Sequence, residues 1–134
     1  MNRTDILTKL LGQHATLRAL MDECDRLIAA AAVVEVERVI ARLSVAFDAH
    51  NHFEESVLEP ILIDIDAFDA VRLARMLSDH ESEHRTLHER LGALEPGTVR
   101  DMLATLRHHL EAEERYFLSP RVVRDDLVVL EGGA

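Results

Sequence analysis

Cysteine, aromatic residues and clustered basic residues are all scarce in this chain. Among its 134 residues there is one cysteine, Cys24, so an internal disulfide or a cysteine-based zinc or iron–sulfur site cannot form. Aromatic residues make up only 4% and glycine and proline are few, which favours helices over strands. Because a lone cysteine suits a reducing compartment, we expect a cytoplasmic protein.

Long apolar runs and basic patches are missing too. No stretch approaches the roughly 20 apolar residues of a membrane span, and the first residues lack the apolar segment of a signal peptide. The formal net charge is −10, with no run of lysine or arginine. We therefore expect no membrane association and no nucleic-acid partner. The length suits one folded domain with a buried core.

Four segments carry apolar residues at the three- and four-residue spacing of an amphipathic helix. The predicted helices span about residues 4–31, 34–59, 69–91 and 98–118. Thr4 is the expected N-cap of the first, Pro60 is expected to end the second, and Gly92 and Pro96 interrupt the chain before the fourth. Long helices with short connections predict an all-α, antiparallel up-down-up-down four-helix bundle.

This bundle is predicted to comprise residues 1–118. Residues 119–134 are expected to form a C-terminal tail, in which RVVRDDLVVL could fold into a short packing helix before a disordered end.

Histidine and glutamate occupy positions on all four helices where the apolar stripe should be buried. These residues are His14, His50, Glu54, His80, His84, His109 and Glu113. Three helices carry such residues as an i, i+4 pair, which places both side chains on one face. At about 1.5 Å of rise per residue, antiparallel helices bring all of them to one level of the bundle. Burying them costs several kcal/mol unless they are paired or bind metal.

These residues predict a site for one or two transition-metal ions. Imidazole suits iron, zinc, copper and nickel, and a carboxylate can bridge two ions. One His-x3-Glu motif would be weak support, whereas three pairs and a lone histidine in register are specific as a set.

The remaining histidines lie off the apolar stripes. We expect His52, His88 and His108 in solvent, together with Asn51 and Glu55. No separate acid–base pair, nucleophile or substrate pocket stands out, so a binding protein is favoured over an enzyme. Cys24, on the buried stripe of the first helix, is expected to pack in the core.

As a set, the motifs resemble the hemerythrin family, in particular its small bacterial HHE cation-binding members. The resemblance covers nearly the whole chain and implies two iron ions in an oxo- or hydroxo-bridged centre, with zinc as the less favoured metal. It assigns His80, His84 and His109 to one iron and His14 and His50 to the other. Glu54 and Glu113 would bridge the two ions. Oxygen-carrying members place their last carboxylate five residues after the histidine, so Glu114 is an alternative bridge.

The implied ligand count leaves one coordination position open, on the iron held by His14 and His50. A vacancy of this kind predicts a partner such as O2 or another small diatomic ligand. We therefore expect reversible O2 binding or sensing, or the handling of iron and reactive oxygen. The alternative is a stress-response or repair protein that acts on nitric oxide, peroxide or iron–sulfur clusters. We expect a monomer or a weak homodimer.

Overall fold

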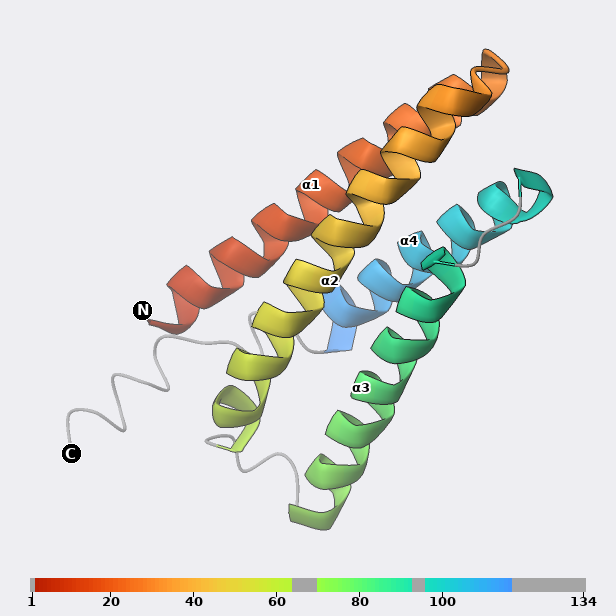
Figure 1. Ribbon diagram of the computed structural model, residues 1–134. Helices are drawn as coiled ribbons and strands as arrows, with labels where there is room; N and C mark the ends of the chain where they lie inside the picture. The colour runs from red at the N-terminus through yellow and green to blue at the C-terminus, as the bar shows by residue number, and fades with distance from the viewer. Residues whose placement is uncertain (1, 64–69, 93–95, 117–134) are drawn as a thin grey trace.

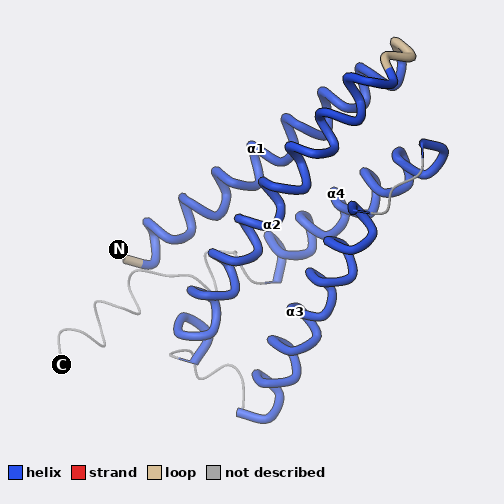
Figure 2. Tube along the Cα trace, in the orientation of Figure 1, coloured by secondary structure: helices blue, strands red, loops and turns tan. Residues whose placement is uncertain are grey.

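Four helices make up most of the residues that the structure describes. The structure is a computed structural model, and it describes residues 2–63, 70–92 and 96–116. The helices are α1 (Arg3–Ala29), α2 (Val33–Ile63), α3 (Ala70–Gly92) and α4 (Val99–Tyr116), with a one-turn 3-10 helix, η1 (Pro96–Thr98), before α4. They alternate in direction and lie alongside one another (Figure 1; Figure 2). This arrangement confirms the predicted all-α four-helix bundle.

The N-cap of helix α1 lies two residues earlier than expected. Asn2, not Thr4, is the capping residue: its side-chain oxygen accepts a hydrogen bond from the backbone N–H of Asp5 at 2.7 Å. The Asp5 carboxylate accepts the Asn2 N–H in return at 3.1 Å. This reciprocal capping box needs an acidic or amide residue three positions after the cap, and the pair Asn2 and Asp5 meets that requirement.

Helix α2 contradicts the expectation that Pro60 ends it. The helix continues through Pro60 to Ile63, so residues 60–63 of the expected connector are helical. Proline removes one intrahelical hydrogen bond but leaves the following residues free to adopt helical dihedral angles. The rest of that connector, the residues from 93 to 95 and the predicted tail lie outside the described residues.

The apolar core fills the half of the bundle nearest the turn between α1 and α2. It takes residues that follow His14 on α1 and His84 on α3, residues that precede His50 on α2, and residues of α4 from Val99 to Leu110, the neighbour of His109. Its members include Leu17, Met21, Cys24, Leu43, Phe47, Leu87, Met102 and Leu106. Cys24 is fully buried, as predicted. The polar residues therefore form a layer at one edge of a continuous apolar core.

No helix within the described ranges is long and apolar enough to cross a membrane.

Candidate metal centre

All the polar stripe residues converge in the interior of the bundle. Their exposed fractions range from 0% for His14 and Glu54 to 6% for His80. They come from every helix: His14 from α1; His50 and Glu54 from α2; His80 and His84 from α3; His109 and Glu113 from α4. The structure thus brings together every residue that the sequence predicted for the site.

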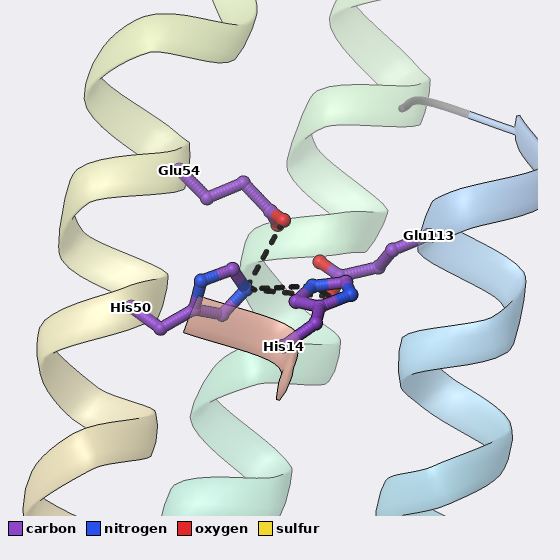
Figure 3. A group of neighbouring side chains, drawn as sticks. All are labelled: His14, His50, Glu54 and Glu113. Atoms are coloured by element: carbon purple, nitrogen blue, oxygen red, sulfur yellow. Dashed lines mark hydrogen bonds and ion pairs between the residues drawn. The ribbon is translucent and has the colours of Figure 1, made fainter. Parts of the chain in front are cut away.

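Two histidines and two glutamates form the first half of the centre (Figure 3). The Nε2 atoms of His14 and His50 face each other at 3.1 Å. His14 Nε2 lies 3.2 Å from Glu113 Oε1, and His50 Nε2 lies 3.3 Å from Glu54 Oε2. Separations of about 3 Å are those of neighbouring ligands around one ion with bonds of about 2.1 Å.

The second half uses the opposite oxygen of each carboxylate. Glu113 Oε2 lies 2.9 Å from His80 Nε2 and 3.1 Å from His84 Nε2. Glu54 Oε1 lies 3.2 Å from His84 Nε2 and also contacts His80 Nε2. Both glutamates therefore turn one oxygen toward each half of the centre, which is the arrangement of carboxylates that bridge two ions.

Within the described residues, two clusters have donor atoms that all lie within 4.8 Å of one another. Both contain Glu54 and Glu113, one with His14 and His50 and the other with His80 and His84. His109 lies beside them: its ring stacks on His80 with centroids 5.7 Å apart, and its Nε2 is 3.4 Å from Glu113 Oε1. Its assignment to the second half stays a prediction.

Opposite charges are stabilised inside this layer. Burial alone would lower the pKa of the histidines, but hydrogen bonds with Glu113 and Glu54 outweigh it. They raise the pKa of His50 and His80 to about 9 and that of His84 to about 10. Burial would likewise raise the pKa of both carboxyl groups, yet hydrogen bonds hold both pKa values below their usual range: those from His50 and His80 act on Glu54, and those with Glu54 and the histidines act on Glu113. A cation that binds here must therefore displace protons from imidazole.

An outer ring of hydrogen bonds orients four of the histidines. The acceptor in each case lies on the preceding helix around the bundle, and it binds the Nδ1 atom. The pairs are Gln13 of α1 with His50 of α2 at 2.6 Å, Glu55 of α2 with His84 of α3 at 3.0 Å, Glu83 of α3 with His109 of α4 at 2.7 Å, and Glu114 of α4 with His14 of α1 at 2.7 Å. Because these oxygens can only accept, Nδ1 donates and Nε2 points inward, as metal binding requires.

The surroundings of the centre change three sequence-based assignments. Glu55, predicted on the wet side, is only 31% exposed and binds His84. Asn51, also predicted in solvent, is buried at 5% exposure. Glu114, the alternative bridge, faces outward and binds both His14 and Arg18, whose Nη1 lies 2.6 Å away. This placement supports Glu113 as the bridging residue.

The sequence pattern did not identify Gln13 and Glu83 as hydrogen-bond acceptors for the histidines of the centre. Each adjoins a stripe histidine in the chain, a signal that sequence reasoning could have used. His52, His88 and His108 are exposed, as predicted.

The donor set fits a transition-metal ion. Three inward atoms are buried and make ion-pair contacts of 3.2–3.4 Å but no hydrogen bond: Glu54 Oε2, Glu113 Oε1 and His109 Nε2. A buried polar group without a hydrogen bond costs about 1–3 kcal/mol, and a bound cation would satisfy all three. Mixed imidazole and carboxylate ligands suit iron, zinc or copper, whereas magnesium and calcium prefer oxygen alone.

Comparison with known proteins adds one match. A family model described as "Hemerythrin HHE cation binding domain" matches residues 5–120, which include every residue of the centre. No curated protein and no solved structure matches the chain.

Proposed function

Since this chain belongs to the hemerythrin HHE cation-binding domain family, we propose that it holds a non-haem di-iron centre that binds O2 or another small diatomic ligand. One observation carries the proposal: two clusters of ligand atoms share both Glu54 and Glu113. Two ions that share two carboxylates fit this arrangement better than a single ion does. Bound iron would supply reversible one-electron redox chemistry and affinity for diatomic ligands.

The protein's own residues would set the conditions at the centre. The outer ring fixes each Nε2 toward the interior, so the imidazoles are oriented before an ion arrives. The apolar side chains of Leu10, Leu17 and Phe47, each at most 2% exposed, exclude water from the same level. Exclusion of water and protons favours reversible binding of a small apolar ligand over its reduction.

The two halves offer different numbers of histidines. One cluster holds His14 and His50 and the other holds His80 and His84, and we assign His109, whose ring stacks on His80, to the second. The half with fewer imidazoles leaves more room for an added ligand. We therefore propose the side of His14 and His50 as the place where a diatomic ligand binds.

Metal analysis and spectroscopy test this function together. Protein expressed in iron-supplemented medium and purified without a nickel column should contain about two irons per chain. The oxidised form should show a near-ultraviolet charge-transfer band that disappears on reduction and changes again with O2. Zinc in place of iron, or spectra that do not change on reduction or on addition of O2, would contradict the proposal.

The alternative role, turnover of nitric oxide or peroxide or repair of iron–sulfur clusters, would use the same centre. The carboxylates beside the centre, Glu55, Glu83 and Glu114, are already hydrogen-bonded to its histidines, so no observation favours this role over ligand binding. Steady-state consumption of peroxide or nitric oxide by the iron-loaded protein would support this alternative over simple ligand binding.

A further inference from the structure

A polar groove of about 270 Å³ lies between α2 and α3, outside the metal centre. Its lining residues are Asp48, Asn51, His52, Glu55, Glu81, His84, Arg85 and His88. Residues 50–55 of α2 supply His50 and Glu54 to the centre, and the other polar residues of this segment, Asn51, His52 and Glu55, all line the groove. His84 belongs to both the groove and the centre.

The chemistry of the groove favours a divalent transition-metal ion. With neutral histidines, three carboxylates face one guanidinium, so the lining carries a net charge of −2. Asp48 and His52 lie one turn apart on α2, and His88 of α3 reaches across with Nδ1 3.6 Å from Asp48 Oδ1. Imidazole and carboxylate together suit iron, cobalt or zinc better than magnesium or calcium.

Asn51 gives an independent sign of a ligand. Its side chain lines the groove, is only 5% exposed, and its Oδ1 atom has no hydrogen-bond partner. A buried carbonyl oxygen is normally satisfied by a donor or by a cation. A hydrated cation in the groove would meet this requirement through one of its water molecules or directly.

The ring of His84 separates the groove from the centre. Its Nδ1 atom binds Glu55 Oε1 at 3.0 Å on the groove side. Its Nε2 atom lies 3.1 Å from Glu113 and 3.2 Å from Glu54 on the inner side. Because His84 itself is almost fully buried, an ion in the groove is one imidazole ring away from the buried ligands.

We propose that this groove is the loading site through which a divalent transition-metal ion reaches the buried centre. Asp48, His52 and His88 capture the hydrated ion, and Glu55 and His84 pass it inward. The closely spaced donor clusters among the described residues are those of the centre alone, so the groove suits brief capture rather than lasting binding. This inference rests on the proposed function, since it requires a metal-binding centre.

Loading kinetics test the groove. Metal-free protein is mixed with Co(II) in a stopped-flow instrument, and the visible bands of the bound ion report the filling of the centre. Asp48→Asn should slow loading at least about threefold because it removes part of the negative charge that attracts the ion, and His52→Ala and His88→Ala should each do so because they remove a ligand of the captured ion. The triple variant should load about tenfold more slowly, since a charged cleft raises association rates by 10–10³. The final absorbance and the cobalt content should equal those of the unaltered protein.

The matched control removes one imidazole and one carboxylate elsewhere. His108→Ala combined with Glu111→Gln alters exposed positions on α4, which contributes nothing to the groove lining, and should load at the normal rate. Unchanged rates in the groove variants, or equal slowing in this control, would overturn the loading route. If the unaltered protein took up no cobalt in its centre, the proposed function itself would fail.

Discussion

Glu113 and Glu114 are neighbours in the chain with opposite environments. Glu113 is 1% exposed, and its oxygens lie between the two halves of the centre. Glu114 is 30% exposed, binds His14 from outside, and is neutralised by Arg18. Arg18 and His14 lower the pKa of Glu114 against the effect of burial, so it accepts hydrogen bonds as a carboxylate. Two adjacent positions of the helix thus have different roles: Glu113 is a candidate metal ligand, and Glu114 orients a histidine from outside the centre.

Substitution of these two glutamates should have different effects on metal content. Glu113→Gln removes a negative charge that both halves share, so we expect about one iron per chain or none. Glu114→Gln leaves the inner ligands in place and should keep about two irons, with affinity reduced about 10–100-fold, as is usual for outer partners of ligating histidines. Iron quantitation and competition with a chelator measure both effects. The reverse result would identify Glu114 as the bridge.

The sequence predicted the inner residues better than the outer ones, for a physical reason. Charged and imidazole side chains interrupt an apolar stripe visibly, so residues such as His50 and Glu54 stand out. The outer acceptors occupy positions where polar residues are ordinary. Gln13 and Glu83 acquire a role only because their side chains reach the histidine of the next helix, and helical spacing does not fix that contact.

Metal binding should depend steeply on pH. His50, His80 and His84 have pKa values of about 9, 9 and 10 in the metal-free protein, above the ordinary value of 6.5. An ion binds the neutral rings, so it should release about one proton from each at neutral pH. Calorimetry in buffers with different ionisation enthalpies counts these protons, and apparent affinity should rise with pH up to about 9. Affinity independent of pH would contradict the expectation.

The same pKa shifts determine how the stability of the metal-free protein changes with pH. Rings with a raised pKa stabilise the fold fully below pH 6.5, and this contribution is lost as the pH rises through about 9. Glu54 and Glu113 have lowered pKa values, so their contribution is present above 4.5 and is lost as the pH falls further. Thermal unfolding of the metal-free chain should therefore show greatest stability between about pH 4.5 and pH 6.5, where both contributions are present.

The turn between α1 and α2 has an unusual residue at its key position. Ala31 has a φ of 56°, the left-handed conformation that glycine normally occupies after a helix. The N–H groups of Ala31 and Ala32 donate to the carbonyls of Ile28 and Leu27, both at 3.0 Å, and so close the end of α1. This pattern is a Schellman motif without its glycine.

Replacement of Ala31 with glycine should stabilise the protein. Glycine adopts the left-handed conformation without the steric cost of a Cβ atom, so Ala31→Gly should raise the free energy of unfolding by about 1 kcal/mol. Ala30→Gly is the matched control, because Ala30 has a φ of −86° and gains nothing from the change. Urea denaturation measures both variants. A loss of stability in Ala31→Gly would show that the turn is held differently.

Helical periodicity predicted all four α-helices of the described residues, and the errors lie at their ends. The first helix was expected to run to about residue 31, yet it ends at Ala29. The second was expected to stop at Pro60, where the backbone in fact continues helical to Ile63. Ends depend on local hydrogen bonds and on packing by other helices, which a periodic pattern does not contain.

The bundle assembles its centre from side chains that are far apart in the chain. His14 and Glu113 lie at opposite ends of the matched family region, and their contact at 3.2 Å requires α1 and α4 to pack together. Arg107 of α4 reinforces this pairing by binding Asp22 and Asp25 of α1 at 2.9 and 2.7 Å. The site is therefore a property of the assembled bundle, and no single helix could form it.

Deletion of residues 119–134 should leave the fold and the metal centre intact. Every residue of the centre precedes position 114, and the described part of α4 ends at Tyr116. We expect a chain that stops after Leu118 to keep its metal content and to lose less than about 1 kcal/mol of unfolding free energy. If the tail mediates a weak homodimer, size-exclusion chromatography at increasing concentration will show dimer only in the full chain. A chain that stops after Leu106 is the control: without His109 and Glu113, it should lose the centre. Loss of metal from the longer truncation would show that the tail belongs to the domain.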